Sequence, residues 1–266
     1  MSDDAIPLPE GEDPEAWARL LRANWERRSR TDKRDFYVAS HRGWQDPGRW
    51  EAQAEIDVHT MFYGVDAELA RGWDVLEIGC GVGRLAGPLT ARASSYTGFD
   101  VAAGMVEEAR TRSASLERAR FFVGDGLHVP AEARDREYDL ALAVAVFIHC
   151  PRSVIASNVA SALETLRPGG QLRLQVLADP EDPEGISSLE AAASDHAEML
   201  AVEAEHDDEE TQDLIEGHYY MGDRFRYAEL DPFLRAAGAD DVLVFRPTLQ
   251  HMYAIVTKAG GAADEG

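Results

Sequence analysis

Residues 75–83 read Val75-Leu76-Glu77-Ile78-Gly79-Cys80-Gly81-Val82-Gly83, and this stretch decides the fold. A short apolar strand, predicted over residues 74–78, runs directly into three closely spaced glycines. Glycine permits tight turning and lets the backbone approach a ligand closely. The helix predicted over residues 84–92 directs its N-terminal amides into the same space, which suits an anionic or carboxylate group. We therefore expect residues 75–89 to form the floor of a ligand site.

Strands and helices alternate regularly from this stretch onward. Strands are predicted over residues 74–78, 95–99, 120–123, 138–146 and 171–177, and helices over 84–92, 102–112 and 153–166. Such alternation is typical of a parallel sheet with helices on both faces. A helix over residues 225–237 and two strands over 241–246 and 251–257 follow. A short turn joins these last two strands, so one of them must run antiparallel to the rest.

The chain divides into six segments on the same evidence. A disordered tail is expected over residues 1–14, a helical cap or lid over 15–64, and the core over 65–178. An acidic helical insertion over residues 179–224 is followed by the terminal helix and hairpin over 225–258 and a second disordered tail over 259–266. No Lys or Arg lies between Arg173 and Arg224. Such an acidic stretch is typical of a solvated face or a contact between two copies, so a homodimer is among the expectations.

Composition excludes several classes of function. The formal net charge of the 266 residues is -23, and phosphate binding needs a basic surface, so no nucleic-acid partner is expected. No run of about 18 apolar residues suggests a membrane span. The acidic N-terminus does not read as a signal peptide, and two cysteines are too few for a disulfide framework. These features favour a cytoplasmic protein, and no metal ion is expected.

The ends of the predicted strands carry the candidate ligand residues. Open parallel sheets bind ligands beyond the carboxyl ends of their strands, and Asp100 ends the second strand. A carboxylate there can accept hydrogen bonds from two ribose hydroxyls. These features alone fit any adenosine-like ligand, and Gly81-x-Gly83-x-x-Ala86 also satisfies a dinucleotide-binding pattern. An NAD-dependent oxidoreductase is therefore one alternative.

Three further features distinguish a dinucleotide site from a site for another adenosine-like ligand. Glu77 lies inside the first strand, where a pyrophosphate site has no clear use for an anion but a cationic ligand does. Asp125, within Gly124-Asp125-Gly126 after the third strand, can accept a hydrogen bond from an adenine amino group. Residues 166–170 (Leu-Arg-Pro-Gly-Gly) lead into the fifth strand, and the chain closes with the hairpin. Glu77 could instead belong to a buried ion pair, and Asp125 could merely shape a turn.

Together these motifs resemble the class I S-adenosylmethionine (SAM)-dependent methyltransferase family. Residues 75–83 resemble its first motif, Gly98-Phe99-Asp100 its ribose-binding acid, and Phe122-Val123-Gly124-Asp125 its adenine-contacting motif. Residues 138–149 and 166–170 resemble its fourth-strand motif and the turn before strand five. The resemblance implies an α/β fold with a Rossmann-like, seven-stranded, mostly parallel sheet and an antiparallel terminal strand. It also implies methyl transfer from SAM to an oxygen, nitrogen or carbon of a small molecule by in-line displacement.

The resemblance assigns a role to each candidate cofactor residue. The residues expected to hold the methionine part of SAM are Glu77, Gly79, Cys80, Gly81, Gly83, Val144 and Ala145. Asp100 is expected to hold the ribose, with Val101 beside it, and Asp125, Gly126 and Leu127 are expected to frame the adenine. The side chains of Cys80 and Cys150 are interpreted as small buried groups without a catalytic role.

The acceptor side is less determined. His149 follows the fourth strand, close to where the transferred methyl should sit, and a neutral imidazole there could accept a proton from the acceptor. Equally, His149 could pack as a turn residue before Pro151. The candidate acceptor-binding residues are Tyr37, His41, Trp44, Tyr63, His218, Tyr219 and Tyr220. A SAM-binding protein without catalysis is the second alternative.

Overall fold

The N-terminal part of the computed structural model is helical. The structure describes residues 13–38, 45–186 and 222–260. Asp13 caps the first helix, because its side chain accepts a hydrogen bond of 3.0 Å from the Glu15 amide. The helix therefore begins at Pro14, which the predicted tail over 1–14 had included. The four helices of this part are α1 (Pro14–Arg28), α2 (Arg34–Val38), α3 (Pro47–Met61) and α4 (Ala67–Ala70).

One sheet forms the centre of the molecule. Its strands are β1 (Asp74–Ile78), β2 (Ser95–Asp100), β3 (Ala119–Val123), β4 (Tyr138–Ala143), β5 (Leu166–Ala178), β6 (Arg224–Phe225), β7 (Asp241–Phe245) and β8 (His251–Thr257). Their order is β3-β2-β1-β4-β5-β8-β7, and the two-residue β6 pairs with β5 off this path. Among the described strands, β8 alone runs in the opposite direction to the others, and it pairs antiparallel with both β5 and β7. The mostly parallel sheet with an antiparallel terminal strand is confirmed, with β6 as an additional, eighth strand.

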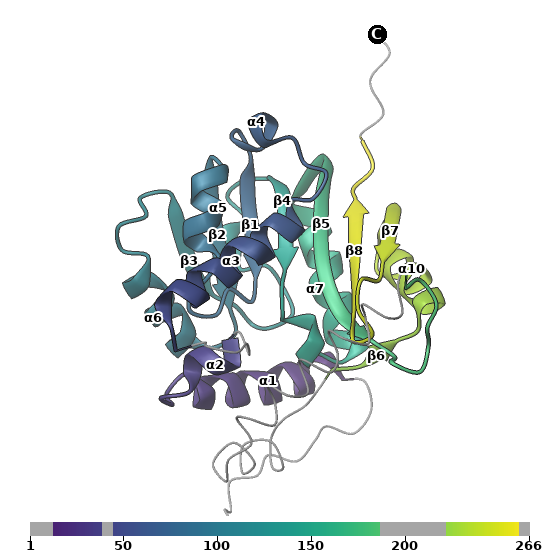
Figure 1. The fold of residues 1–266 in the computed structure, drawn as a ribbon, viewed down its shortest axis with the longest axis horizontal. Helices are drawn as coiled ribbons and strands as arrows, with labels where there is room; N and C mark the ends of the chain where they lie inside the picture. Colours follow the sequence, from purple (N-terminus) through teal and green to yellow (C-terminus); the bar gives the residue numbers. More distant parts are fainter. Residues whose placement is uncertain (1–12, 39–44, 187–221, 261–266) are drawn as a thin grey trace, which may run out of the picture.

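Helices cover both faces of the sheet (Figure 1). Within the described residues, the other α-helices are α5 (Ala86–Arg92), α6 (Ala103–Arg112), α7 (Arg152–Thr165) and α10 (Tyr227–Ala236). Alternation of side chains along β1 sends Val75 to one face, where it shares an apolar cluster with Val58 of α3 and Leu89 of α5. Leu76 points to the other face and shares a cluster with Ile155 of α7. Burial on both faces explains why the strands read as continuous apolar runs.

Several predicted boundaries differ from the structure, and three of these differences have a clear structural reason. The fourth strand ends at Ala143 rather than at residue 146, because Ala145 has a φ of 56° and the chain then enters a 3-10 turn, Phe147–His149. The fifth strand begins at Leu166 instead of residue 171, since Leu166 already pairs with Tyr138. The helix predicted over 225–237 begins at Tyr227, and β6 precedes it.

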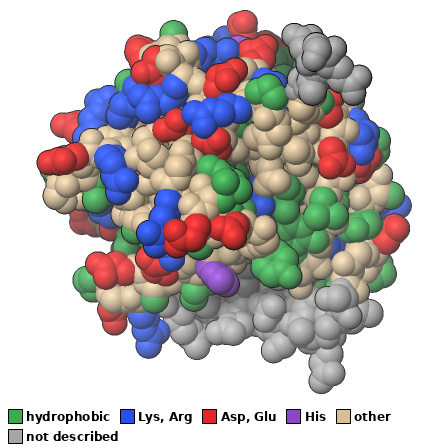
Figure 2. Space-filling model, turned by 90° about the horizontal axis from the view of Figure 1, so that it is seen from above, with side chains coloured by type: hydrophobic (Ala, Val, Ile, Leu, Met, Phe, Trp, Pro, Cys, Tyr) green, Lys and Arg blue, Asp and Glu red, His purple; other side chains and the backbone are tan. Residues whose placement is uncertain are grey.

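Helices α1 and α2 lie across the end of the sheet at which the parallel strands β1, β2 and β4 finish (Figure 1). Helix α4 and the end of β8 lie at the opposite end. Seen from that opposite end, basic side chains are interspersed with acidic ones (Figure 2). In the described ranges, no helix has the length and apolarity needed to cross a membrane.

Candidate functional site

The glycine loop after β1 forms a floor at the carboxyl end of the sheet. Gly79, Gly81 and Gly83 have φ values of 67°, 51° and 76°, in the left-handed region that favours glycine. At Gly79 a side chain would also collide, because a Cβ there would lie 2.3 Å from the Val146 side chain. Both conformation and space therefore require glycine at residue 79, and the predicted floor has the expected geometry.

Asp100 connects this floor to the next strand and helix. Its two carboxylate oxygens accept hydrogen bonds of 2.9 Å from the amides of Gly81 and Ala102. Burial raises the pKa of Asp100 to about 6, although the amides of Ala102, Gly81 and Val101 oppose the shift. A carboxylate has about four acceptor sites, so Asp100 keeps acceptor capacity for two ligand hydroxyls.

A cavity of about 750 Å³, open to solvent, lies above Asp100 and the glycine loop. Five of the predicted cofactor residues line it: Gly79, Gly81, Asp100, Val101 and Gly126. The carboxylate of Asp100 is the one charged side chain among its described lining residues.

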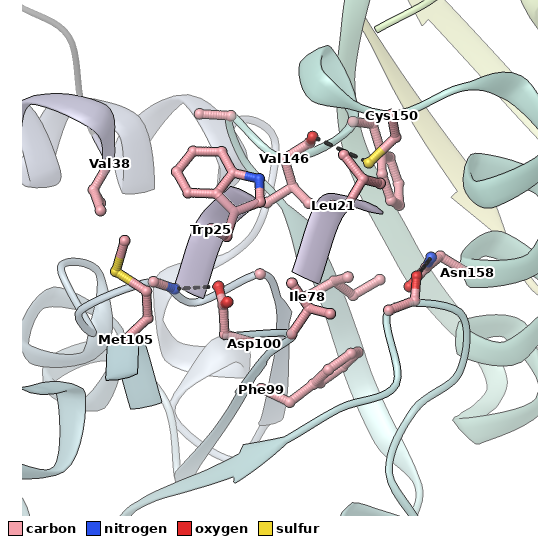
Figure 3. A pocket seen from close by; sticks show the side chains of 16 residues that line it. Leu21, Trp25, Val38, Ile78, Phe99, Asp100, Met105, Val146, Cys150 and Asn158 are labelled. Carbon is pink, nitrogen blue, oxygen red and sulfur yellow. Dashed lines mark hydrogen bonds between the residues drawn. The ribbon is translucent and has the colours of Figure 1, made fainter. Parts of the chain in front are cut away.

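Helix α1 supplies the roof of the cavity. Leu21 and Trp25 project from α1 over Asp100 and Ile78, while Val38 of α2 lies above Met105 (Figure 3). The helix is tied down by residues on either side of Trp25. Glu26 accepts a hydrogen bond of 3.1 Å from the Gly104 amide at the start of α6, and Arg22 donates one of 3.2 Å to the Gly124 carbonyl.

Roof residues such as Leu21 and Trp25 were not among the predicted site residues. In the sequence, Trp17, Leu20, Leu21 and Trp25 recur at helical spacing, a pattern that is typical of any packed helix. The tryptophans of residues 15–64 were the one sequence feature that could have indicated a cap in contact with the cavity.

His149 lies directly beneath this roof. Its ring meets that of Trp25 edge to face, with centroids 5.2 Å apart, and the residue is 6% exposed. His149 is not among the residues that line the cavity, but its neighbours Phe147 and Cys150 are. The structure thus places the candidate base behind the lining residues, where the Trp25 side chain covers it.

Glu77 does not line the cavity. The pleat places its side chain on the same face as Val75, beneath α3, where Tyr96 donates a hydrogen bond of 2.5 Å to it. Burial raises the pKa of Glu77 to about 7, while Tyr96 and the nearby Arg84, itself paired with Asp57 at 2.6 Å, oppose the shift. The predicted contact with the methionine part has no geometric support, and Glu77 belongs to a buried polar cluster.

Five other predicted cofactor residues also lie outside the lining: Cys80, Gly83, Asp125, Leu127 and Val144. The side chain of Cys80 is buried in the apolar cluster of α3 and α5, and burial raises the pKa of its thiol well above the usual range. Gly83 packs against α6 and β3, where a Cβ would meet Ala109 and Phe121 at 3.2 Å. Leu127 belongs to the opposite apolar cluster. At the end of β4 the lining residue is Ala145, whereas Val144 packs beneath α3.

Asp125 shapes the turn after β3, as one of its two interpretations had it. One carboxylate oxygen accepts hydrogen bonds of 2.7 Å from the amides of Leu127 and His128, and the other contacts His128 Nδ1 at 2.8 Å. Burial would raise the pKa of Asp125, but the bonds from His128 and Leu127 lower it overall. The turn brings Gly126 to the cavity and leaves the Asp125 side chain half-exposed beside it.

Two of the predicted acceptor-binding residues lie outside the lining of the cavity. Tyr63 is 75% exposed, and its carbonyl accepts a bond of 2.8 Å from Arg173, towards the opposite end of the sheet. Tyr37 is buried against Phe36 and the guanidinium of Arg28, and its neighbour Val38 lines the cavity instead. The other five lie outside the described residues: His41, Trp44, His218, Tyr219 and Tyr220.

Both cysteines are buried, as interpreted from the sequence. Cys150 is a lining residue, and burial raises the pKa of its thiol to about 12. Cys150 is therefore protonated at neutral pH and serves as part of an apolar wall.

Comparison with known proteins identifies the domain. Residues 75–170 match the family model of a methyltransferase domain. The methyltransferase GfsG of Streptomyces halstedii is 32% identical over 139 residues, which are 49% of this chain and 48% of that protein. The O-methyltransferase cnsE of Penicillium expansum is 32% identical over 157 residues, 57% of this chain and 54% of that protein. The chain thus spans about half the length of the curated relatives it matches.

Solved structures show the same fold. The magnesium protoporphyrin IX methyltransferase of Synechocystis PCC 6803, crystallised with bound SAM, has a TM-score of 0.56 at 14% identity, covering 95% of this chain and 100% of that one. The complex of DhpI with S-adenosylhomocysteine (SAH) has a TM-score of 0.55 at 19% identity, covering 92% and 97%. The Rossmann-like methyltransferase fold is therefore confirmed.

Proposed function

Because the chain carries a methyltransferase domain of the class I family over residues 75–170, we propose that it transfers a methyl group from SAM to a small molecule. The observation that carries the proposal is the cavity itself. It joins the glycine loop, the buried Asp100 carboxylate and the turn at Gly126 along the carboxyl ends of β1, β2 and β3. SAM would place its methionine part at the glycine loop, its ribose at Asp100 and its adenine at the turn.

The residues present fit SAM. The backbone of Gly79 and Gly81 offers close approach for the methionine part, and Asp100 has free acceptor capacity for the ribose hydroxyls. Gly126 lies where the adenine would follow, next to the half-exposed Asp125 carboxylate. When bound, SAM supplies an electrophilic methyl group on a sulfonium. The apolar roof of Leu21 and Trp25 excludes water from that region, and the walls align an acceptor for in-line attack.

The acceptor is proposed to be a small molecule that presents an uncharged surface to the cavity. Asp100 is the one charged side chain among the described lining residues, and Leu21, Trp25, Met105 and Phe147 provide apolar contact. A net charge of -23 opposes nucleic-acid phosphates. Oxygen is the favoured nucleophile, since cnsE and the ubiquinone biosynthesis relative of Vibrio cholerae, 24% identical over 143 residues, are named O-methyltransferases.

His149 is proposed as the group that takes the proton from the acceptor. It follows the end of β4, beside the lining residue Cys150, and its ring contacts that of the lining residue Trp25. Imidazole is the side chain that most often serves as a general base in enzymes. His149→Ala should lower kcat more than it weakens SAH binding. Equal activity of the variant and the wild type over a range of pH would remove His149 from the mechanism.

The test of the proposed function follows the methyl group. The full chain is incubated with methyl-labelled SAM and a panel of small phenols, and the label in the extracted product is counted. We expect label transfer to at least one phenol, and its loss in Asp100→Asn. Saturable SAH binding without methylation of any panel member would instead favour the alternative of a SAM-binding protein that does not catalyse transfer.

A further inference from the structure

The turn after β4 has a strained backbone in the wall of the cavity. Ala145 has a φ of 56°, and among the described residues no other non-glycine has a positive φ. The left-handed conformation places the Cβ of an L-residue against its own carbonyl, a cost that glycine does not bear. Such a residue persists only where its surroundings hold it, and these residues concentrate at functional sites.

Two contacts hold this turn. The side-chain oxygen Oε1 of Gln175, a buried residue of β5, accepts a hydrogen bond of 2.9 Å from the Ala145 amide. On the other side, the Val146 side chain fills the space above Gly79 so closely that a Cβ on Gly79 would lie 2.3 Å from it. The turn is therefore fixed between the fifth strand and the glycine loop.

The same three residues, Gly79, Ala145 and Val146, line the cavity, whereas Gln175 does not. The conformation of residue 145 determines where Val146 lies. The hydrogen bond that Gln175 accepts from the Ala145 amide therefore fixes the shape of this wall. We propose that Gln175 is a positioning residue, which holds the β4 turn in the left-handed conformation that the cofactor site requires. The inference rests on the proposed SAM site and adds a residue behind it.

A neutral acceptor suits this place. Gln175 is 8% exposed, and an ionised carboxylate at that depth would carry a desolvation penalty that an amide avoids. Methionine has nearly the same length and shape but no strong acceptor, so Gln175→Met removes the hydrogen bond and keeps most of the packing. Gln171→Met is a matched control, because Gln171 is a glutamine of the same strand that bonds to Arg173 instead.

Calorimetry with SAH measures the effect on binding. We expect Gln175→Met to raise the Kd by roughly three- to tenfold, the range of one buried hydrogen bond, and to raise KM for SAM more than it lowers kcat. Gln171→Met should bind SAH like the wild type. In the ligand-free protein, the Ala145 amide should exchange with deuterium faster in Gln175→Met. Wild-type Kd and amide exchange in Gln175→Met would overturn the inference.

A glycine at residue 145 separates positioning from packing. Glycine adopts the left-handed conformation without strain, so Gln175→Met should raise the Kd much less in an Ala145→Gly background. An equal rise in both backgrounds would show that Gln175 acts through general packing and would also overturn the inference. Failure of the wild type to bind SAH would instead refute the proposed function, so the two failures can be told apart.

Discussion

Replacing Asp100 by asparagine tests the ribose contact. The carboxylate now accepts from two amides, Gly81 and Ala102, each at 2.9 Å. An asparagine has one oxygen, so its NH2 group must face one of those donors, and the remaining oxygen carries no charge. A hydrogen bond to a charged group contributes about 1.5–3 kcal/mol. Loss of one such hydrogen bond between residue 100 and a ribose hydroxyl should weaken SAH binding by roughly 10- to 100-fold.

The pH dependence of binding gives a second readout for Asp100. Its pKa in the free protein is raised to about 6 by burial, and ribose hydroxyls bind the ionised form. Wild-type affinity for SAH should therefore be full above pH 6 and fall by up to about tenfold per pH unit below it. Asp100→Asn should lack this component.

Calorimetric titration with SAH between pH 5 and pH 8 measures both effects. Asp66→Asn is a matched control, since Asp66 caps α4 at the far end of the sheet and asparagine caps as well. Wild-type affinity in Asp100→Asn, with the same dependence on pH, would refute the assignment of Asp100 to the ribose.

Two further variants test the packing around the site. The folded-state pKa of Glu77 is about 7 against an ordinary 4.5, so the free energy of unfolding of the wild type should fall by about 3 kcal/mol as pH rises from 4.5 to 7. Glu77→Gln should lack this fall, and urea unfolding at pH 5 and pH 8 measures it. An equal change with pH in both proteins would contradict the prediction. Gly104→Ala should lower the Tm, because its Cβ would lie 2.2 Å from Ser29 Oγ of the segment that follows α1. Adding Ser29→Gly should restore most of that loss, and no restoration would contradict the contact.

The floor of the site was predictable because its signals are local. Strand alternation, the glycine spacing and Asp100 at a strand end are all read within about 25 residues, and the fold rule then places them at one edge. Gly79 and Asp100 accordingly lie where they were expected. Glu77 lies outside the lining because the pleat turns its side chain away from the cavity, and its charge alone gives no sign of that direction.

The roof was not predictable because its signals are not local. The position of α1 depends on Glu26 meeting the Gly104 amide and Arg22 meeting the Gly124 carbonyl, contacts between residues 78 and 102 positions apart. No periodicity in residues 14–28 encodes those partners. Tyr63 shows the same limit, since the path of α3 across the sheet carries it away from the cavity.

The most direct measurement of the central claim is a pair of calorimetric titrations of the full chain, one with SAH and one with NADH. Both ligands contain adenosine and both suit an acid after the second strand, so the comparison isolates what the glycine loop accepts. We expect saturable binding of SAH at one site per chain, weakened by Asp100→Asn, and no saturable binding of NADH. Binding of NADH without binding of SAH would contradict the claim and favour a nicotinamide-dependent oxidoreductase.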